Sequence, residues 1–241
     1  MKSIFDNVIR ISACAGLATA AGCATPTIDV ASAPFSRESI EWQDLWVEHA
    51  DSSELPRVLM LGDSISRQYR GRVSQLLSGK AVVANSAGSR CVGDPALLAE
   101  TRYVLSLYDW DVIHFNNGLH GGDCSDEDFA RHLKEWIDLI REIRPKAKLV
   151  WGTITTTHDA FAPRVAVRNA AADRIIAAYG DIAVDDLGKI SREHPEYLSG
   201  DKVHFNGQGV QALGDSVAAS VEKWLTKDWI IGESGSQKIL P

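Results

Sequence analysis

The sequence contains no run of lysine and arginine residues interleaved with aromatic residues. Its 241 residues include 25 Lys and Arg against 32 Asp and Glu, which gives a formal net charge of −7 at pH 7. Proteins that bind the phosphate backbone of nucleic acids gather positive charge on one face or along one helix. We therefore expect no nucleic-acid partner.

The sequence also lacks the patterns of two common kinds of cofactor site. His and Cys residues do not occur at the spacings typical of a zinc site, and no glycine-rich loop has the pattern that cradles phosphates. We therefore expect neither a metal nor a cofactor. The composition, 45% hydrophobic and 24% charged, is that of an ordinary globular protein, and the length suits one domain with a buried core.

The first residues predict export. Lys2 and Arg10 precede an apolar, small-residue stretch at 11–24, which is too short to cross a bilayer as a mature helix. We interpret residues 1–22 as a signal peptide, with a buried N-terminal helix as the alternative. Residues 23–40 are then a linker, 41–229 the folded domain and 230–241 a loosely held tail.

A lipid anchor is one outcome of this signal. Ala20-Ala21-Gly22-Cys23 resembles a bacterial lipobox, in which the Cys becomes lipidated and N-terminal. Ala20 occupies the place of the usual Leu, so a lipoprotein and a soluble product both stay open. A lipid on Cys23 is the one membrane contact that we expect. The protein is then periplasmic, envelope-anchored or secreted in a bacterium.

Two of the four cysteines remain in the mature domain. Cys14 leaves with the signal, and Cys23 is cleaved off or lipidated. Cys91 and Cys124 are then alone in an oxidising compartment, which favours a disulfide between them. Two free buried thiols are the alternative.

From Arg57 onward, short β-rich runs alternate with longer amphipathic stretches, a pattern typical of parallel strands joined by crossover helices. Trp42 and Trp46, four residues apart, predict a short helix that packs on the domain before the first strand. The predicted strands are Val58–Leu61, Ala81–Asn85, Val112–Phe115, Leu149–Gly152 and Ile182–Val184. The predicted helices are Ser66–Leu77, Asp126–Arg144, Arg164–Tyr179 and Gln208–Trp224.

A candidate nucleophile follows the first predicted strand. Gly62-Asp63-Ser64 lies between this strand and a helical pattern, so Ser64 is expected near a helix N-terminus, where free N–H groups favour developing negative charge. The tripeptide alone is weak evidence, because Gly214-Asp215-Ser216 repeats it inside the last predicted helix. We interpret that second copy as structural.

A serine hydroxyl needs a base, and the base needs an acceptor that holds one tautomer. Asp201-Lys202-Val203-His204 supplies both on a loop before the last helix. The three-residue separation lets the Asp201 carboxylate fold back to Nδ1 of His204 and leaves Nε2 facing Ser64. The sequence therefore predicts a Ser64, His204 and Asp201 triad.

Gly62-Asp63-Ser64 and Asp201-x-x-His204 resemble the first and last blocks of the SGNH/GDSL hydrolases. The resemblance covers roughly Arg57 to Trp224. It implies a serine esterase with a single three-layer α/β/α domain, in which the central, mostly parallel sheet has five strands in a flavodoxin-like arrangement. It also implies that the N–H groups of Ser64 and Gly88 hold the oxyanion, since Gly88 is similar to the family glycine after the second strand.

The third family block, Gly-x-Asn-Asp, is replaced here by Phe115-Asn116-Asn117-Gly118-Leu119-His120, closer to a variant of some bacterial members. The variant's spacing favours Asn116 over Asn117 as the amide donor to the oxyanion. His120 is either a substrate contact or a histidine packed beside the site, and His114 is expected to be buried structure. Asp63 and Thr153, the latter in a threonine-rich loop after a strand, are further candidate substrate contacts.

The resemblance implies acyl transfer from an ester. Export, a polar site rim and likeness to bacterial members that act on sugars favour removal of acetyl or another small acyl group from a carbohydrate. A lipase, lysophospholipase or thioesterase would carry the same blocks. The third possible function is that of an inactive envelope protein that binds carbohydrate. Under the same resemblance, a Cys91–Cys124 bridge would brace the two oxyanion loops.

Overall fold

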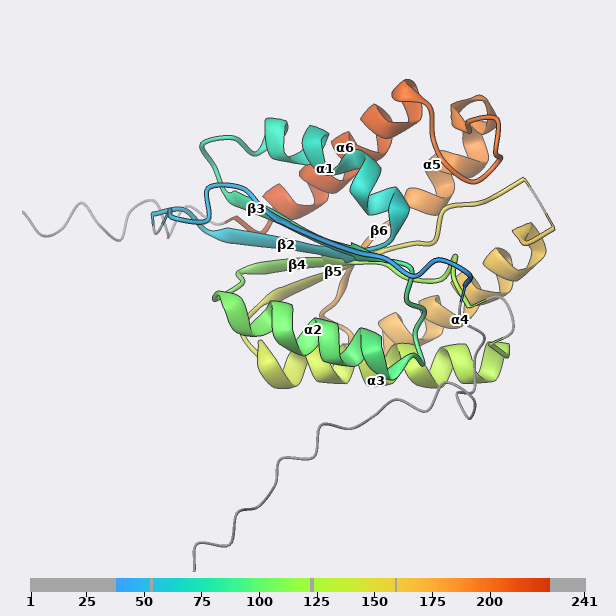
Figure 1. The fold of residues 1–241 in the computed structure, drawn as a ribbon, viewed down its shortest axis with the longest axis horizontal. Helices are drawn as coiled ribbons and strands as arrows, with labels where there is room; N and C mark the ends of the chain where they lie inside the picture. The colour runs from blue at the N-terminus through green and yellow to red at the C-terminus, as the bar shows by residue number, and fades with distance from the viewer. Residues whose placement is uncertain (1–37, 53, 122–123, 159, 226–241) are drawn as a thin grey trace, which may run out of the picture.

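The computed structural model describes residues 38–52, 54–121, 124–158 and 160–225. The predicted signal peptide, Cys23 and the predicted tail at 230–241 lie outside these residues. In the described part, a single sheet lies between two layers of helices (Figure 1). The strands are β1 (Gln43–Val47), β2 (Arg57–Gly62), β3 (Val82–Gly88), β4 (Val112–Phe115), β5 (Lys148–Gly152) and β6 (Ala183–Asp185). The helices are α1 (Ser64–Leu76), α2 (Pro95–Leu107), α3 (Asp126–Ile143), α4 (Ala162–Tyr179), α5 (Leu187–Glu193) and α6 (Gly207–Glu222), with a 3-10 turn at Pro195–Tyr197.

The sheet has the strand order β1-β3-β2-β4-β5-β6. Strands β2 to β6 pair in parallel, and the edge strand β1 pairs antiparallel with β3. The predicted α/β fold with a mostly parallel sheet is therefore confirmed, with six strands instead of five. In such open sheets, ligands bind outside the carboxyl ends of the parallel strands.

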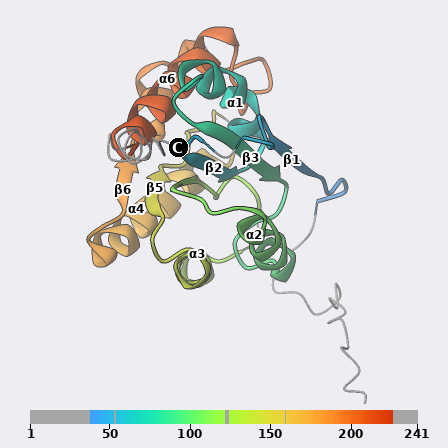
Figure 2. The same ribbon diagram turned by 90° about the vertical axis from the view of Figure 1, so that its left-hand side faces the viewer.

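Each face of the sheet has its own hydrophobic core, beneath the helices that Figure 2 shows on the two sides of the sheet. On one face, Val58 and Met60 of β2 pack with α1 and α6. On the other, Leu59 and Leu61 pack with α2, α3 and α4. Because both faces are covered, the central strands are nearly continuous hydrophobic runs, which is why the sequence shows them clearly.

Helix α3 shows how the sequence builds one of these layers. Ser125 caps its N-terminus, and its hydroxyl accepts a hydrogen bond from the N–H of Asp128 at 3.1 Å. The apolar residues recur at helical spacing and are buried against the sheet. They are Phe129, Leu133, Trp136, Ile137 and Ile140.

The expectation of a helix at Trp42 and Trp46 is wrong, since these residues flank and belong to strand β1. A spacing of four residues places two side chains on one face of a helix and also on one face of a strand. The guanidinium groups of Arg67 and Arg70 lie over the two indole rings, at 5.4 and 5.1 Å from the ring centroids. The two tryptophans therefore pack on α1 from an edge strand.

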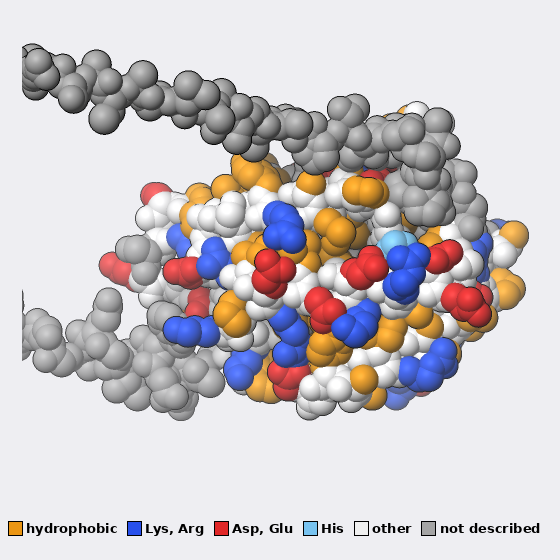
Figure 3. Space-filling view, turned by 90° about the horizontal axis from the view of Figure 1, so that it is seen from below, with side chains coloured by type: hydrophobic (Ala, Val, Ile, Leu, Met, Phe, Trp, Pro, Cys, Tyr) orange, Lys and Arg blue, Asp and Glu red, His pale blue; other side chains and the backbone are white. Residues whose placement is uncertain are grey.

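The outer face of α2, α3 and α4 carries acidic, basic and apolar side chains side by side (Figure 3). No single charge dominates the part of this face that the structure describes. The described helices include none with the length and apolar character that a membrane span requires.

Candidate active site

The turn from β2 into α1 places Ser64 at the carboxyl edge of the sheet. Ser64 is the first residue of α1, so its N–H has no acceptor within the helix. A Cβ atom on Gly62 would lie 2.7 Å from Cβ and Oγ of Ser66. The turn therefore requires glycine at position 62.

Asp63 forms the N-cap of α1. Its Oδ1 accepts a hydrogen bond from the N–H of Ile65 at 2.9 Å, and the residue is fully buried. Burial raises the pKa of this carboxyl group. The sequence proposed Asp63 as a substrate contact, whereas the structure places it beneath the surface as a helix cap.

Ser64 lies in hydrogen-bonding order with His204 and Asp201, two residues from a loop about 140 residues further along the chain. Nε2 of His204 is 2.8 Å from Oγ of Ser64. Nδ1 of the same ring is 2.7 Å from Oδ2 of Asp201. The structure therefore brings together Ser64, His204 and Asp201.

The loop before α6 holds the carboxylate in place. Oδ1 of Asp201 accepts hydrogen bonds from the N–H groups of Val203 at 3.0 Å and His204 at 2.9 Å. Lys202 has a φ of 65°, which turns the chain so that both N–H groups face the same oxygen. These backbone bonds, together with the His204 ring, hold the pKa of Asp201 well below its usual value. Asp201 is therefore ionised at neutral pH.

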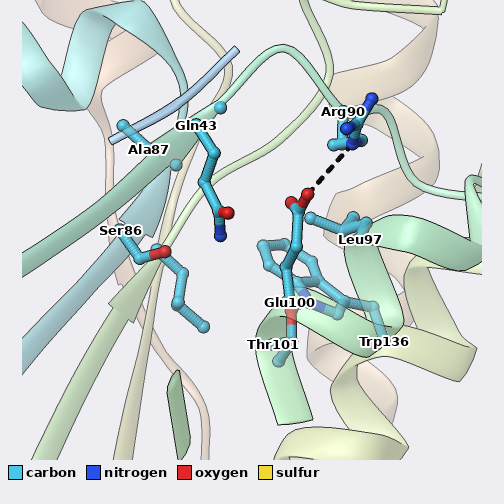
Figure 4. A pocket seen from close by; sticks show the side chains of 11 residues that line it. Gln43, Ser86, Ala87, Arg90, Leu97, Glu100, Thr101 and Trp136 are labelled. Atoms are coloured by element: carbon cyan, nitrogen blue, oxygen red, sulfur yellow. Dashed lines mark hydrogen bonds and ion pairs between the residues drawn. The ribbon is translucent and has the colours of Figure 1, made fainter. Parts of the chain in front are cut away.

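Gly88 ends β3 beside this turn, one residue beyond the pairing of Gly62 with Ala87. A Cβ atom on Gly88 would lie 3.1 Å from the carbonyl oxygen of Trp42, just before the neighbouring strand β1. A small hollow of about 20 Å³, room for little more than one water molecule, lies against Gly62 and Gly88 on the α2 side (Figure 4). Its polar lining includes Gln43 of β1 and Glu100 of α2, which is ion-paired with Arg90 at 3.1 Å.

The two candidate asparagines follow β4 and are both buried. Nδ2 of Asn116 lies 2.7 Å from the carbonyl oxygen of Gly152 and 3.3 Å from that of Thr153. The amide of Asn117 instead binds the loop after β3: Nδ2 donates to the carbonyl of Arg90 at 2.8 Å, and Oδ1 accepts from the N–H of Val92 at 3.1 Å. Nδ2 of Asn117 carries two N–H groups and makes one hydrogen bond among the described residues. Its second N–H group is therefore available to a bound molecule.

The remaining candidate substrate contacts are engaged with the protein. Nδ1 of His120 is 2.5 Å from Oε1 of Glu38, and its side chain is 14% exposed. The hydroxyl of Thr153 donates to Asp186 at 2.9 Å and accepts from the N–H of Gly188 at 2.8 Å. Thr153 therefore anchors the start of α5, whereas His120 keeps part of its ring at the surface.

His114 and Ser216, which the sequence predicts to be structural, both contact the buried carboxylate of Asp185. His114 is fully buried, with Nε2 3.2 Å from Oδ2 of Asp185. Ser216, in the second Gly-Asp-Ser, lies within α6 and donates to Oδ1 of the same carboxylate at 2.5 Å.

The structure shows no disulfide between Cys91 and Cys124, and both side chains are buried. The two loops are neighbours as expected: a Cβ atom on Gly121 would lie 2.6 Å from Sγ of Cys91 and 3.9 Å from Cβ of Cys124. The Cys124 thiol, however, donates to the carbonyl oxygen of Ser125 at 3.6 Å. Local packing, not a covalent bond, therefore joins these loops.

We expect both cysteines to be found as thiols that react slowly in the native protein. Burial is the main cause that raises the pKa of Cys91 to about 11, so little reactive thiolate exists at pH 8. Alkylation at pH 8, followed by mass mapping, should label Cys91 and Cys124 fully in denaturant without reductant and only slowly without denaturant. A linked Cys91–Cys124 peptide, or rapid native labelling, would contradict this prediction.

The arrangement supports acyl transfer chemistry. It joins a hydroxyl, an imidazole and an ionised carboxylate at a helix N-terminus beside a glycine loop and an asparagine loop. Within the described ranges, no group of three or more His, Cys, Asp or Glu residues could hold a metal ion.

Sequence reasoning missed two residues that shape the site. Glu38 contacts His120 from the segment that we took as linker, and Arg168 of α4 binds the loop after β4. No local signal identifies Glu38. Arg168 could have been noticed in the sequence, because it is the one charged residue among the small and apolar residues on the buried face of α4.

No protein-family model and no curated protein sequence matches this chain. Solved structures do. A carbohydrate esterase of family 3 from Talaromyces cellulolyticus has a TM-score of 0.60 at 14% identity, over 72% of this chain and 99% of its own. A member of the lipolytic G-D-S-L family from Veillonella parvula has a TM-score of 0.58 at 17% identity, over 69% and 98%. The catalytic domain of peptidoglycan O-acetyltransferase A from Streptococcus pneumoniae has a TM-score of 0.56 at 14% identity, over 71% and 96%.

The described domain therefore has the SGNH/GDSL hydrolase fold, as the sequence resemblance predicts. At these identities the likeness establishes the fold alone. The chemistry of the site has to be argued from its own residues.

Proposed function

We propose that this protein is a serine esterase that hydrolyses carboxylic esters through an acyl-enzyme. The observation that carries the proposal is the hydrogen-bond chain from Ser64 through His204 to Asp201, with distances of 2.8 and 2.7 Å. These distances lie within the range in which a base can take the proton of a nucleophile.

In the first half-reaction, Oγ of Ser64 forms a bond to the ester carbonyl carbon while its proton passes to Nε2 of His204. Asp201 accepts the Nδ1–H and stabilises the imidazolium. The tetrahedral intermediate then collapses, the bond to the alcohol oxygen breaks, and His204 returns the proton to that oxygen. In the second half-reaction, water attacks the acyl group with His204 as base, and Ser64 regains its proton as the carboxylic acid leaves.

The oxyanion is held by the N–H groups of Ser64 and Gly88 and by one asparagine amide. The spacing in the sequence favours Asn116. The hydrogen bonds favour Asn117, since its Nδ2 donates one bond whereas Nδ2 of Asn116 lies near two carbonyl oxygens. We propose Asn117.

Alanine at each position should separate the two candidates. We expect Asn117→Ala to lower kcat by about 10²–10³-fold with a small change in KM, because one oxyanion donor is lost. Asn116→Ala should lower the melting temperature and leave a smaller effect on kcat. Ester hydrolysis and thermal melts of both variants would decide, and the larger loss of kcat in Asn116→Ala would reverse the assignment.

We propose acetyl or another small acyl group on a carbohydrate as the substrate. The hollow beside Gly88 has a volume of only about 20 Å³, and its lining mixes polar residues such as Gln43 with apolar residues such as Leu97, so it offers no room for a long acyl chain. Two of the structural neighbours are described as a carbohydrate esterase and a peptidoglycan O-acetyltransferase. The lipolytic neighbour represents the rival substrate class. Export to the cell envelope, which would give access to such glycans, is part of the same proposal.

Activity should fall with acyl length. Between p-nitrophenyl acetate and the octanoate ester we expect kcat/KM to drop by about tenfold or more, because the small hollow beside Gly88 cannot accommodate a long acyl chain. Acetate release from acetylated glycans would then identify the natural substrate. A preference for octanoate would favour a lipase or thioesterase, and glycan binding without hydrolysis of any ester would favour the inactive envelope protein.

A further inference from the structure

Arg168 is a charged residue of α4 that is almost completely buried, with 1% of its surface exposed. Its guanidinium group binds one segment of backbone. Nη1 donates to the carbonyl oxygens of Gly118 at 2.7 Å and His120 at 2.8 Å, and Nη2 donates to that of Gly121 at 2.6 Å. The aromatic rings of Phe129 and Phe161 lie against the same group, at 5.0 and 5.2 Å from Cζ to the ring centroids.

The segment that Arg168 binds is the loop after β4, which begins at the two candidate oxyanion asparagines and contains His120. Gly118 and Gly121 have φ values of 152° and 69°, a region that other residues rarely adopt. These two turns let three carbonyl oxygens converge on one cation. In a regular helix or strand, the carbonyl oxygens accept hydrogen bonds from backbone N–H groups. Within the segments that the structure describes, the carbonyl oxygens of Gly118 and His120 lack such partners and need another donor, which Arg168 provides.

Burial of a guanidinium group is costly, and it lowers the pKa of Arg168. The three carbonyl bonds offset part of that cost, since hydrogen bonds from a charged donor are stronger than neutral ones, whereas Nε of Arg168 is buried without a hydrogen-bond partner in the described part of the chain. Arginine suits this position because its planar fork offers several donors in fixed directions. Lysine presents a single ammonium group on a flexible stem and cannot reproduce the fork.

We propose that Arg168 is a positioning residue for ester hydrolysis, which holds the loop 116–121 so that the asparagine amide and His120 stay in place beside Ser64. The proposal rests on the proposed function. The opposite side of the loop is held through Glu38, whose carboxylate contacts Nδ1 of His120 at 2.5 Å. Arg168 itself does not touch the substrate; it acts through the backbone that carries the groups that do.

The test compares Arg168→Met and Arg168→Lys with Arg144→Lys as the matched control. Arg144 also donates to a carbonyl oxygen, that of Leu105 at 2.8 Å, and pairs with Asp109 at 2.7 Å, but it lies at the opposite edge of the sheet. We expect Arg168→Met to lower kcat for p-nitrophenyl acetate by about 10²-fold with little change in KM, because small displacements of oxyanion donors are costly. Arg168→Lys should lose less, and Arg144→Lys should keep kcat within about twofold.

Chemical rescue separates positioning from general stability. Added guanidinium chloride at low, non-denaturing concentration should restore part of the kcat of Arg168→Met, whereas ammonium chloride at equal ionic strength should not. The proposal is overturned if Arg168→Met keeps kcat within threefold of the wild type, or if ammonium restores kcat as well as guanidinium does. If Arg168→Met does not fold, the same comparison is made with Arg168→Lys, and a kcat equal to that of the wild type overturns the proposal.

Hydrogen exchange of the loop gives a readout that does not depend on catalysis. Amides of residues 114–121 should exchange faster in Arg168→Lys than in the wild type and be unchanged in Arg144→Lys. Faster exchange in a protein that hydrolyses no ester would refute the esterase and retain the loop anchor. Unchanged exchange in an active enzyme would refute the anchor and retain the esterase.

Discussion

Ser64→Ala should abolish ester hydrolysis, with kcat reduced by about 10⁶-fold, the scale found when the serine of a triad is removed. Without Oγ no acyl-enzyme forms, and the bond of 2.8 Å to Nε2 of His204 is lost. Folding should be unaffected, because the hydroxyl lies at a partly exposed helix N-terminus and the cap of that helix is Asp63. The measurement is steady-state hydrolysis of p-nitrophenyl acetate beside a thermal melt.

The chain offers a matched control in its second Gly-Asp-Ser. Ser216→Ala removes the same hydroxyl from the same tripeptide, but this hydroxyl donates to the buried carboxylate of Asp185 at 2.5 Å. We expect Ser216→Ala to lower stability by about 1 kcal/mol and to leave kcat within about twofold of the wild type. Equal hydrolysis by wild type and Ser64→Ala would refute the nucleophile and with it the proposed function.

Asp201→Asn should lower kcat by about 10⁴-fold, since an amide in this position favours the wrong tautomer of the base. Both oxygens of the carboxylate act as acceptors here: Oδ1 binds the N–H groups of Val203 and His204, and Oδ2 binds Nδ1 of His204. An amide has one oxygen. If that oxygen keeps the two backbone bonds, the NH₂ group of the amide faces Nδ1 of His204 and donates to it. The imidazole proton then lies on Nε2, and Nε2 cannot accept the proton of Ser64.

Asp215→Asn is the control for this change, because its carboxylate is exposed and pairs with Arg72 at 2.7 Å on the surface of α6. Such exposed pairs contribute little, so kcat and melting temperature should change by small amounts only. A kcat of Asp201→Asn within tenfold of the wild type would show that His204 does not depend on this carboxylate.

The sequence predicted the sheet interior and the longer helices well. Strands β2 and β4 are buried on both faces and are rich in apolar residues, with His114 the polar exception in β4, and α3 has a strong helical period. Helix α2 was missed although Asp94 and Pro95 form a recognisable helix start. Strand β1 could not be recognised locally, because its partner is β3, about forty residues further along the chain, and its two tryptophans are compatible with a helix or a strand.

At the site, the nature of each reacting group could be predicted from the sequence. A serine after a strand and an Asp-x-x-His before the last helix carry their chemistry in their own residues and immediate neighbours. The lack of a disulfide between Cys91 and Cys124 and the hydrogen-bond partners of the two asparagines could not be predicted, because each depends on distances between segments that are far apart in the sequence.

By itself, the sequence determined which side chains can act as nucleophile, base and acceptor, and that parallel strands would carry their loops to one edge, since periodicity and residue type are local properties. Only the tertiary structure decided which loop contacts which: the asparagines against the carbonyls of β5 and the loop after β3, Glu38 against His120, and Arg168 beneath the loop of Gly118. The physical reason is that hydrogen bonds between distant segments require distances set by the packing of the whole domain.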